Sequence, residues 1–174
     1  LEGSLKLRAR GFRLESVPTL ADRQFRGLVN GDVALDGLGY APKLDGELTV
    51  HGLEVAQARV ETARLAIEAE HGRLASSLTV RQTDGYLDAR VEAGLEWQQN
   101  LVPKLPAKGP LVARAHAKSF RAAVLQPLVR DTVSKLDGRI DGNVRLDVRG
   151  GKTGVGGKVE LREGVICAKR HIHM

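Results

Sequence analysis

Apolar residues alternate with charged or polar residues along most of this chain. In the clearest run, Tyr86–Trp97, every second residue is Leu, Ala, Val or Trp and most residues between them are charged. A period of two is the pattern of a β-strand that turns one face toward a core and the other toward water. Strands of a buried parallel sheet are apolar on both faces, so we expect long antiparallel strands instead.

Other segments share the alternation and are joined by glycine-containing pairs. The clearest are Leu5–Arg10, Thr62–Glu70, Val144–Arg149 and Lys158–Arg162. The longer stretch Ala56–Glu70 is ambiguous, because its Ala, Glu and Arg residues also favour a helix, and we predict a strand there. Glycine after Asn, Asp or Gly is typical of hairpin turns, so these pairs predict a meander. The predicted turns are Asn30-Gly31, Asp36-Gly37, Asp45-Gly46, Asp84-Gly85, Asp141-Gly142, Gly150-Gly151 and Gly156-Gly157.

Two segments interrupt the alternation and predict short helices. Pro127–Leu136 has a proline suited to the first helical turn, aliphatic residues on one face and Gly138 just beyond its end. Pro18–Arg26, followed by Gly27, is a weaker copy of this pattern. Asn100–Pro110 contains three prolines and predicts an extended loop.

The two helix-like segments precede matching glycine patterns. Gly27, Asn30-Gly31 and Leu35 recur 111 residues later as Gly138, Asp141-Gly142 and Leu146. In each copy a further glycine follows 15 residues after Gly31 or Gly142, at Gly46 and Gly157. The pattern predicts a repeat of short helix, strand, loop and strand, whose one-sided apolar strands must stack to share a core. Chance recurrence of Asp-Gly turns is the alternative.

Composition limits the class of protein. The 174 residues suffice for one domain with a sizeable core, and 42% of them are hydrophobic. No stretch free of Asp, Glu, Lys and Arg exceeds the eight residues of 122–129, whereas a membrane-spanning helix needs about 20 apolar residues. Cys167 is the single cysteine, so no intrachain disulfide forms.

The formal net charge of +6 admits nucleic acid, anionic lipid or an acidic protein as a partner. Acidic residues are interspersed among the basic ones, as in Arg145–Arg149, and Lys6–Arg13 is the only compact basic stripe. The chain has only six aromatic residues, whereas single-strand binders need aromatic platforms. A basic nucleic-acid-binding module is therefore the less favoured alternative.

Motifs for catalysis, metals and cofactors are incomplete. The Gly-Lys pairs at 151–152 and 157–158 lack the earlier glycine of a phosphate loop. The segment Asp137–Val148 lacks two of the oxygen ligands of a calcium loop. His51, His71 and His116 are isolated along the chain. We therefore expect no enzyme, no metal site and no cofactor.

The segment Leu136–Gly150, followed by Gly156–Ile166, resembles the C-terminal region of the TamB family, the inner-membrane subunits of the translocation and assembly module, and the related AsmA-like superfamily. The resemblance covers about a third of the chain. It rests on glycine and aliphatic positions in two copies: Gly142, Val144, Leu146, Gly150, Gly157, Val159, Leu161 and Gly164, and Gly31, Val33, Leu35, Gly37, Gly46, Leu48, Val50 and Gly52.

This resemblance implies a curved, taco-like antiparallel sheet with an apolar concave face. It further implies a periplasmic location within an inner-membrane-anchored protein, the outer-membrane barrel protein TamA as partner, and a role in moving phospholipid or assisting nascent β-strands during outer-membrane biogenesis.

From the alternation itself we expect a non-enzymatic hydrophobic groove. The residues expected to line it are Leu87, Val91, Leu95, Trp97, Val144, Leu146, Val148, Val159 and Leu161. The alternative is that the same residues form a closed core, which would make the chain a structural β-rich adaptor or protein-interaction domain. We expect residues 1–166 to form one β-rich domain cut from a longer repetitive protein, with residues 167–174 as an appended tail.

Overall fold

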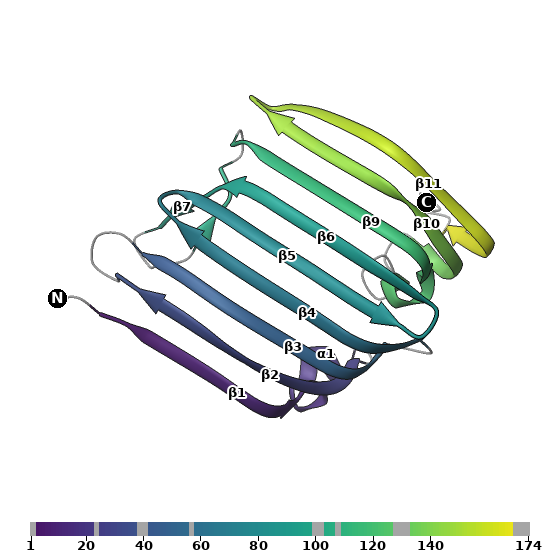
Figure 1. Ribbon diagram of the computed structural model, residues 1–174, viewed down its shortest axis with the longest axis horizontal. Coiled ribbons are helices and arrows are strands. Elements are labelled where there is room, and N and C mark those ends of the chain that lie inside the picture. Colours follow the sequence, from purple (N-terminus) through teal and green to yellow (C-terminus); the bar gives the residue numbers. More distant parts are fainter. Residues whose placement is uncertain are drawn as a thin grey trace, which may run out of the picture.

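The computed structural model describes residues 3–22, 25–37, 42–55, 58–98, 103–106, 109–126 and 133–168. Nine strands form one antiparallel sheet in the order β1-β2-β3-β4-β5-β6-β9-β10-β11 (Figure 1). A short hairpin of β7 and β8 lies outside it. The strands are β1 (Leu5–Arg13), β2 (Phe25–Asp36), β3 (Lys43–Val55), β4 (Ala58–Glu70), β5 (Arg73–Gln82), β6 (Gly85–Gly94), β7 (Glu96–Trp97), β8 (Pro103–Lys104), β9 (Leu111–Arg121), β10 (Val133–Arg149) and β11 (Lys152–Ala168).

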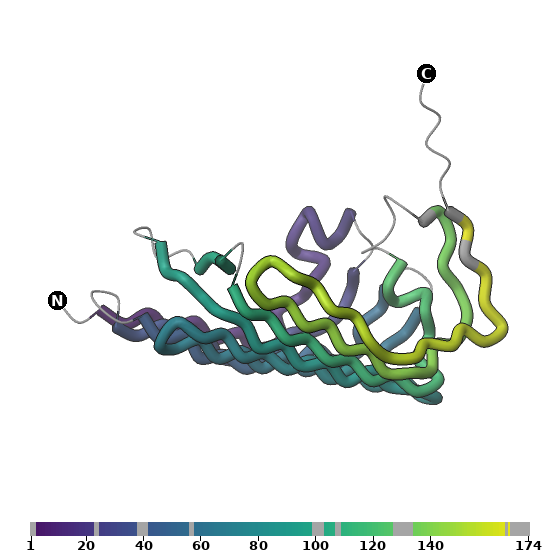
Figure 2. Tube along the Cα trace, turned by 90° about the horizontal axis from the view of Figure 1, so that it is seen from above, coloured from purple at the N-terminus to yellow at the C-terminus, as the bar shows by residue number. Residues whose placement is uncertain are grey.

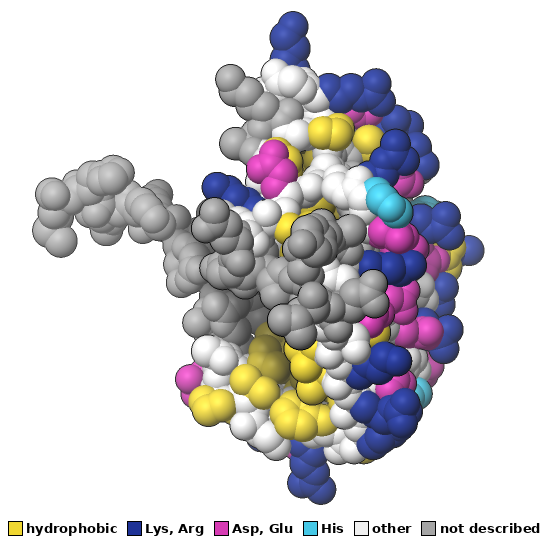
Figure 3. Space-filling view, turned by 90° about the vertical axis from the view of Figure 1, so that its left-hand side faces the viewer, with side chains coloured by type: hydrophobic (Ala, Val, Ile, Leu, Met, Phe, Trp, Pro, Cys, Tyr) yellow, Lys and Arg dark blue, Asp and Glu magenta, His cyan; other side chains and the backbone are white. Residues whose placement is uncertain are grey.

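The sheet is curved and remains open. Neighbours in the sheet follow one another along the chain, apart from the β7–β8 excursion, so the predicted meander is confirmed. β1 and β11 do not pair with each other, and the sheet does not close into a barrel. The side view shows a bulging face rich in charged side chains and an opposite, hollowed side where hydrophobic side chains gather (Figure 3). The expected fold class, a curved antiparallel sheet with short helices, is therefore confirmed.

The helical segments are short and lie on one side of the sheet (Figure 2). They are η1 (Leu14–Ser16), α1 (Pro18–Ala21) and η2 (Ala122–Leu125). The helix expected at Pro18–Arg26 is thus four residues long, and its last predicted residues already belong to β2. The helix expected at Pro127–Leu136 is wrong from residue 133 onward, because β10 begins at Val133; residues 127–132 lie outside the described residues.

Four of the predicted glycine turns lie inside strands instead. Asp36-Gly37, Asp84-Gly85 and Gly150-Gly151 do fall at strand ends, but Asn30-Gly31, Asp45-Gly46, Asp141-Gly142 and Gly156-Gly157 do not. A Cβ added at Gly142, where φ is +146°, would stand 2.1 Å from the carbonyl oxygen of Lys158. Glycine is therefore needed there for close approach of the next strand, a known use of glycine inside sheets.

The register supports the repeat of 111 residues. Gly31 of β2 pairs with Leu48 of β3, and Gly142 of β10 pairs with Val159 of β11, so both partners shift by the same interval. A Cβ at Gly31 would likewise meet the carbonyl oxygen of Glu47 at 2.1 Å. The β2–β3 and β10–β11 hairpins therefore share one glycine-dependent design.

Several strand boundaries differ from the sequence interpretation. Ala58–Glu70 forms β4, as the ambiguous Ala56–Glu70 segment predicted, while residues 56–57 lie outside the described residues. The run Tyr86–Trp97 is not one strand, because β6 ends at Gly94. There the Gly94 N–H donates to the carbonyl oxygen of Pro110 at 2.8 Å, and the Leu95 N–H donates to that of Gly72 at 2.8 Å.

The ends of the remaining predicted segments are also revised. In the expected loop Asn100–Pro110, residues 103–104 pair with β7, and residues 99–102 and 107–108 lie outside the described residues. β11 continues to Ala168, so the first two residues of the expected tail 167–174 belong to the sheet. Residues 169–174 are not among those described.

Candidate functional site

Aliphatic side chains form rows that cross the whole sheet on one face, called here the inner face. Strand pairing places one residue of each strand in each row, because directly opposite residues project to the same side. One row consists of Ala9, Gly31, Leu48, Leu65, Leu78, Ala89, Ala115, Val144 and Gly157. The next consists of Leu7, Val33, Gly46, Ile67, Ser76, Val91, Ala113, Leu146 and Val155.

The inner face contains seven of the nine residues predicted to line a groove. The seven are Leu87 and Val91 on β6, Val144, Leu146 and Val148 on β10, and Val159 and Leu161 on β11. The other two, Leu95 and Trp97, follow the end of β6, and the indole N–H of Trp97 is buried without a hydrogen-bond partner among the described residues.

One end of the inner face is covered. Val60 and Phe120 are almost completely buried there, together with Ala63, Val80 and Ala117. Val124 and Leu125 of η2 pack against this cluster, here called the covered end. Gln82 joins it through a hydrogen bond of 2.8 Å that its side-chain oxygen accepts from the Arg121 N–H. η2 thus covers this region as an ordinary core, although the side-chain nitrogen of Gln82 is buried without a hydrogen-bond partner among the described residues.

The two edge strands leave their inner-face residues bare. Leu5 and Leu7 of β1 are 62% and 67% exposed, and Val155 and Val159 of β11 are 72% and 56% exposed. Large apolar residues at this exposure are unusual when they recur along one face. The inner face therefore combines a covered end with aliphatic rows that are open at both edges of the sheet.

The opposite, outer face carries ion pairs between neighbouring strands. The Arg8 Nε donates to Asp32 across β1 and β2 at 2.6 Å, and this hydrogen bond holds the pKa of Asp32 below its ordinary value. The Arg162 guanidinium on β11 likewise lowers the pKa of Asp141 on β10, aided by the Ser119 N–H at 3.1 Å. The Asp32 side chain is 55% exposed, whereas that of Asp141 is 19% exposed. Ion pairs between exposed side chains contribute little to stability, so the Arg8–Asp32 pair acts mainly on strand registration and local charge.

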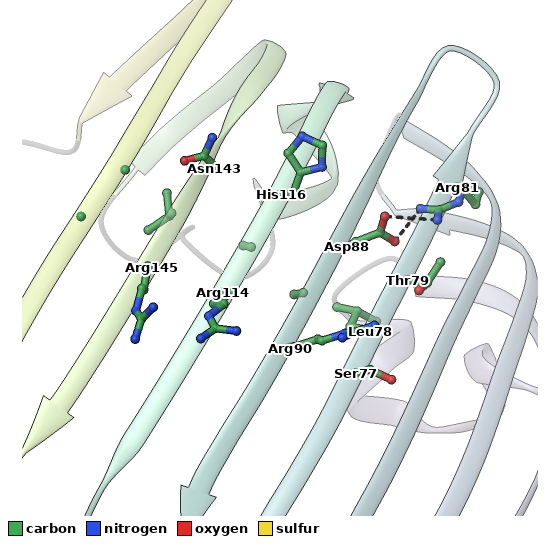
Figure 4. Close-up of a pocket in the computed structure, with 15 residues that line it drawn as sticks. Ser77, Leu78, Thr79, Arg81, Asp88, Arg90, Arg114, His116, Asn143 and Arg145 are labelled. Carbon is green, nitrogen blue, oxygen red and sulfur yellow. Dashed lines mark hydrogen bonds and ion pairs between the residues drawn. The ribbon is translucent and has the colours of Figure 1, made fainter.

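A second feature of the outer face was missed by the sequence interpretation. Figure 4 shows Arg90, Arg114 and Arg145 side by side on β6, β9 and β10, where they line a depression of about 920 Å³. Ser77, Thr79, His116 and Asn143 also line it. The three arginines are far apart along the chain and each alternates with acidic or neutral residues, so only the strand register brings them together.

Metal-ligand clusters and membrane-spanning helices were also sought among the described residues. Among residues the structure describes, no three His, Cys, Asp or Glu side chains gather in a way that could hold a metal ion. No described helix has the length and apolarity required to cross a membrane. Comparisons with protein-family models, with curated proteins and with solved structures found no match to this chain.

Proposed function

We propose that this chain is a hydrophobic-groove domain without enzymatic activity that binds the acyl chains of phospholipids along its inner face. The observation that carries the proposal is the set of aliphatic rows that cross all nine strands while both sheet edges stay open. In the two rows that begin at Ala9 and Leu7 on β1, only Ser76 is polar and no residue is aromatic.

The chemistry of these rows suits a hydrocarbon chain. Leu, Val, Ile and Ala present no hydrogen-bonding group, and burial of each methylene contributes about 0.8 kcal/mol. Because the gain scales with buried length rather than with specific contacts, a continuous face binds a chain better than isolated pockets do. The glycines within the rows, such as Gly31 and Gly157, have no side chain, so the surface of the inner face is recessed at these positions.

The open edges of the sheet also support binding of a second kind of ligand, a nascent β-strand. β1 and β11 each have a neighbour on one side only, so their outer backbone groups are free to accept another strand. Basic residues on β1 and glycines on β11 make the two edges different. An incoming strand and an acyl chain would use the same domain in different ways, by backbone pairing and by apolar contact respectively.

The resemblance to the TamB family gives this proposal a biological setting. On the basis of this resemblance we propose that the domain lies in the periplasm, within an inner-membrane-anchored bridge that works with TamA during outer-membrane biogenesis. The open curved sheet is compatible with that setting.

A structural adaptor with a closed core is the second candidate. It is favoured by the covered end, where η2 and Phe120 seal the sheet as in an ordinary domain. In that case the exposed residues of β1 and β11 would contact neighbouring protein rather than lipid.

Site-specific photocrosslinking separates the two candidates. A photoreactive amino acid at Leu146, on the inner face of β10, is expected to crosslink phospholipid that copurifies from cells. The same amino acid at Arg149 is the control, because Arg149 is three residues further along β10 and residues an odd number of positions apart in a strand project to opposite faces. We expect a lipid adduct at position 146 and little or none at position 149.

Two results would contradict the groove. One is the absence of both copurifying phospholipid and an adduct at position 146; protein adducts alone at that position would instead support the adaptor. The other is equal lipid labelling at positions 146 and 149, which would indicate nonspecific adsorption.

A further inference from the structure

Three arginines occupy neighbouring positions of one row on the outer face. Arg90 pairs with Arg114 across β6 and β9, and Arg114 pairs with Arg145 across β9 and β10. Residues directly opposite each other in antiparallel strands have Cβ atoms about 4.5–5.5 Å apart, and like charges there are destabilising. The row therefore places three positive charges where strand pairing alone would disfavour them.

Two of these three arginines, Arg90 and Arg114, lack the carboxylate partners that other arginines on this face have. Arg8, in the same row on β1, pairs with Asp32, whereas Arg90 and Arg114 have no carboxylate of a described residue within 4.0 Å. Arg145 contacts Asp147 at 3.3 Å, but that carboxylate also binds Arg149 at 3.0 Å. The row thus keeps a local surplus of positive charge.

The acidic residue that lines the same depression already has a partner. Asp88 accepts hydrogen bonds of 2.8 Å and 3.2 Å from Arg81. Along β9 the neighbours of Arg114 are Val112 and His116, neither of which carries negative charge. Arg114 is therefore the centre of the positive row.

The surface around the row is shaped to receive a small group. On the β11 side the row ends at Gly156, where an added Cβ would have no atom within 4 Å, so this side is open. On the β5 side Ser77 supplies a hydroxyl. Together with the depression of about 920 Å³, these residues form a shallow basic site with polar walls.

We propose that this row binds a compact phosphorylated anion, one that carries one or two phosphate groups. Guanidinium groups match phosphate oxygens in geometry and form charge-assisted hydrogen bonds with them. Strand spacing of about 4.8 Å makes the row about 10 Å wide, which suits a diphosphate or a phosphorylated headgroup. The flanking acids Asp88, Glu92 and Asp147 oppose a longer polyanion such as nucleic acid. The site lies on the face opposite the proposed acyl groove and is independent of it.

Calorimetric titration with inorganic pyrophosphate at low ionic strength tests the proposal. Arg114→Gln is expected to weaken pyrophosphate binding by about tenfold or more, because it removes charge-assisted hydrogen bonds. Arg8→Gln is the matched control, with the same change in net charge in the same row but at a carboxylate-paired position. It is expected to leave pyrophosphate affinity within about twofold of the original.

A second readout excludes a purely structural role. Because Arg114→Gln also relieves repulsion between like charges, its midpoint of thermal unfolding should equal or exceed that of the unchanged protein. A lowered midpoint, the same loss of affinity in both variants, or no pyrophosphate binding up to about 1 mM would overturn the proposal. Tighter binding of a short oligonucleotide than of pyrophosphate would also overturn it.

Two further arms identify the source of the phosphate. Vesicles of phosphatidylcholine with and without phosphatidic acid are sedimented with each protein. Binding that requires both phosphatidic acid and Arg114 indicates a lipid headgroup. Pyrophosphate binding without vesicle binding indicates a soluble phosphorylated ligand.

Discussion

One aliphatic row of the inner face is buried along part of its length and exposed at its β11 end. Ala63, Val80 and Ala117 share a row with Val159, and all four are small or medium aliphatic residues on the inner face. The first three are at most 9% exposed, whereas Val159 is 56% exposed. The difference comes from the cover, since η2 packs over the middle of the row and does not reach its β11 end. Equivalent side chains are therefore core in one region and available surface in the other.

The largest effect is expected at the covered end. Phe120→Ala removes a side chain that is 1% exposed and leaves a cavity under η2. Such truncations cost about 3–5 kcal/mol, so the urea midpoint should fall sharply. A loss below about 1 kcal/mol would show that the covered end is not a packed core and does not differ in packing from the exposed β11 end of the row.

The junction between the two regions is expected to depend on Gly142. Gly142→Ala forces a Cβ against the Lys158 carbonyl at a φ of +146°, so the free energy of unfolding should drop by about 1–3 kcal/mol. Gly156→Ala is the matched control on β11, because its Cβ would meet open space. It should change stability by less than about 1 kcal/mol, and similar losses in both variants would contradict the proposed role of close strand approach.

The β10–β11 hairpin should also become less stable in acid. The pKa of Asp141 is lowered in the folded state by the Arg162 hydrogen bond, so the folded state favours the charged form. The stabilisation is present above the ordinary aspartate pKa of about 3.9 and is lost as the pH falls through the lower folded value. Asp141→Asn should flatten the decrease in stability below about pH 4.

Asp22→Asn serves as the control for that pH profile, because Asp22 lies at the C-terminal end of α1 and is not part of the β10–β11 hairpin. Chemical denaturation followed between about pH 2 and pH 6 measures both variants. An unchanged acid profile in Asp141→Asn would show that this ion pair does not stabilise the hairpin.

The smallest effect on stability is expected at the β11 edge of the sheet, where inner-face valines are exposed. Val159→Ala removes two methyl groups from a side chain that is already largely exposed, so stability should change by less than about 0.5 kcal/mol. The same variant should reduce lipid labelling from position 146 if the groove is used. A stability loss above about 1 kcal/mol would mean that the β11 end is covered in solution.

Most of the fold followed from local pattern, and the main errors came from glycine and proline. Alternation located the strands because its period of two is set by backbone geometry within a single strand. Asp141-Gly142 looked like a turn because the same dipeptide serves both in turns and where another backbone comes close. Only the neighbouring strand, through the Lys158 carbonyl, distinguishes the two uses.

The candidate sites divide in the same way. Seven predicted lining residues share the inner face because alternation within a strand sets the side to which each side chain projects. Leu95 is not among them, because β6 ends at Gly94. The row formed by Arg90, Arg114 and Arg145 could not be anticipated, because it depends on the register among three strands and on the excursion between β6 and β9.

Alternation alone specifies long antiparallel strands with one aliphatic and one charged face, since those properties are local to each strand. The assembled sheet establishes which aliphatic residues are covered, how the glycines bring strands together and which arginines become neighbours. Exposure, close approach and like-charge clustering depend on groups distant along the chain, because the positions of such groups are set only when the sheet has assembled.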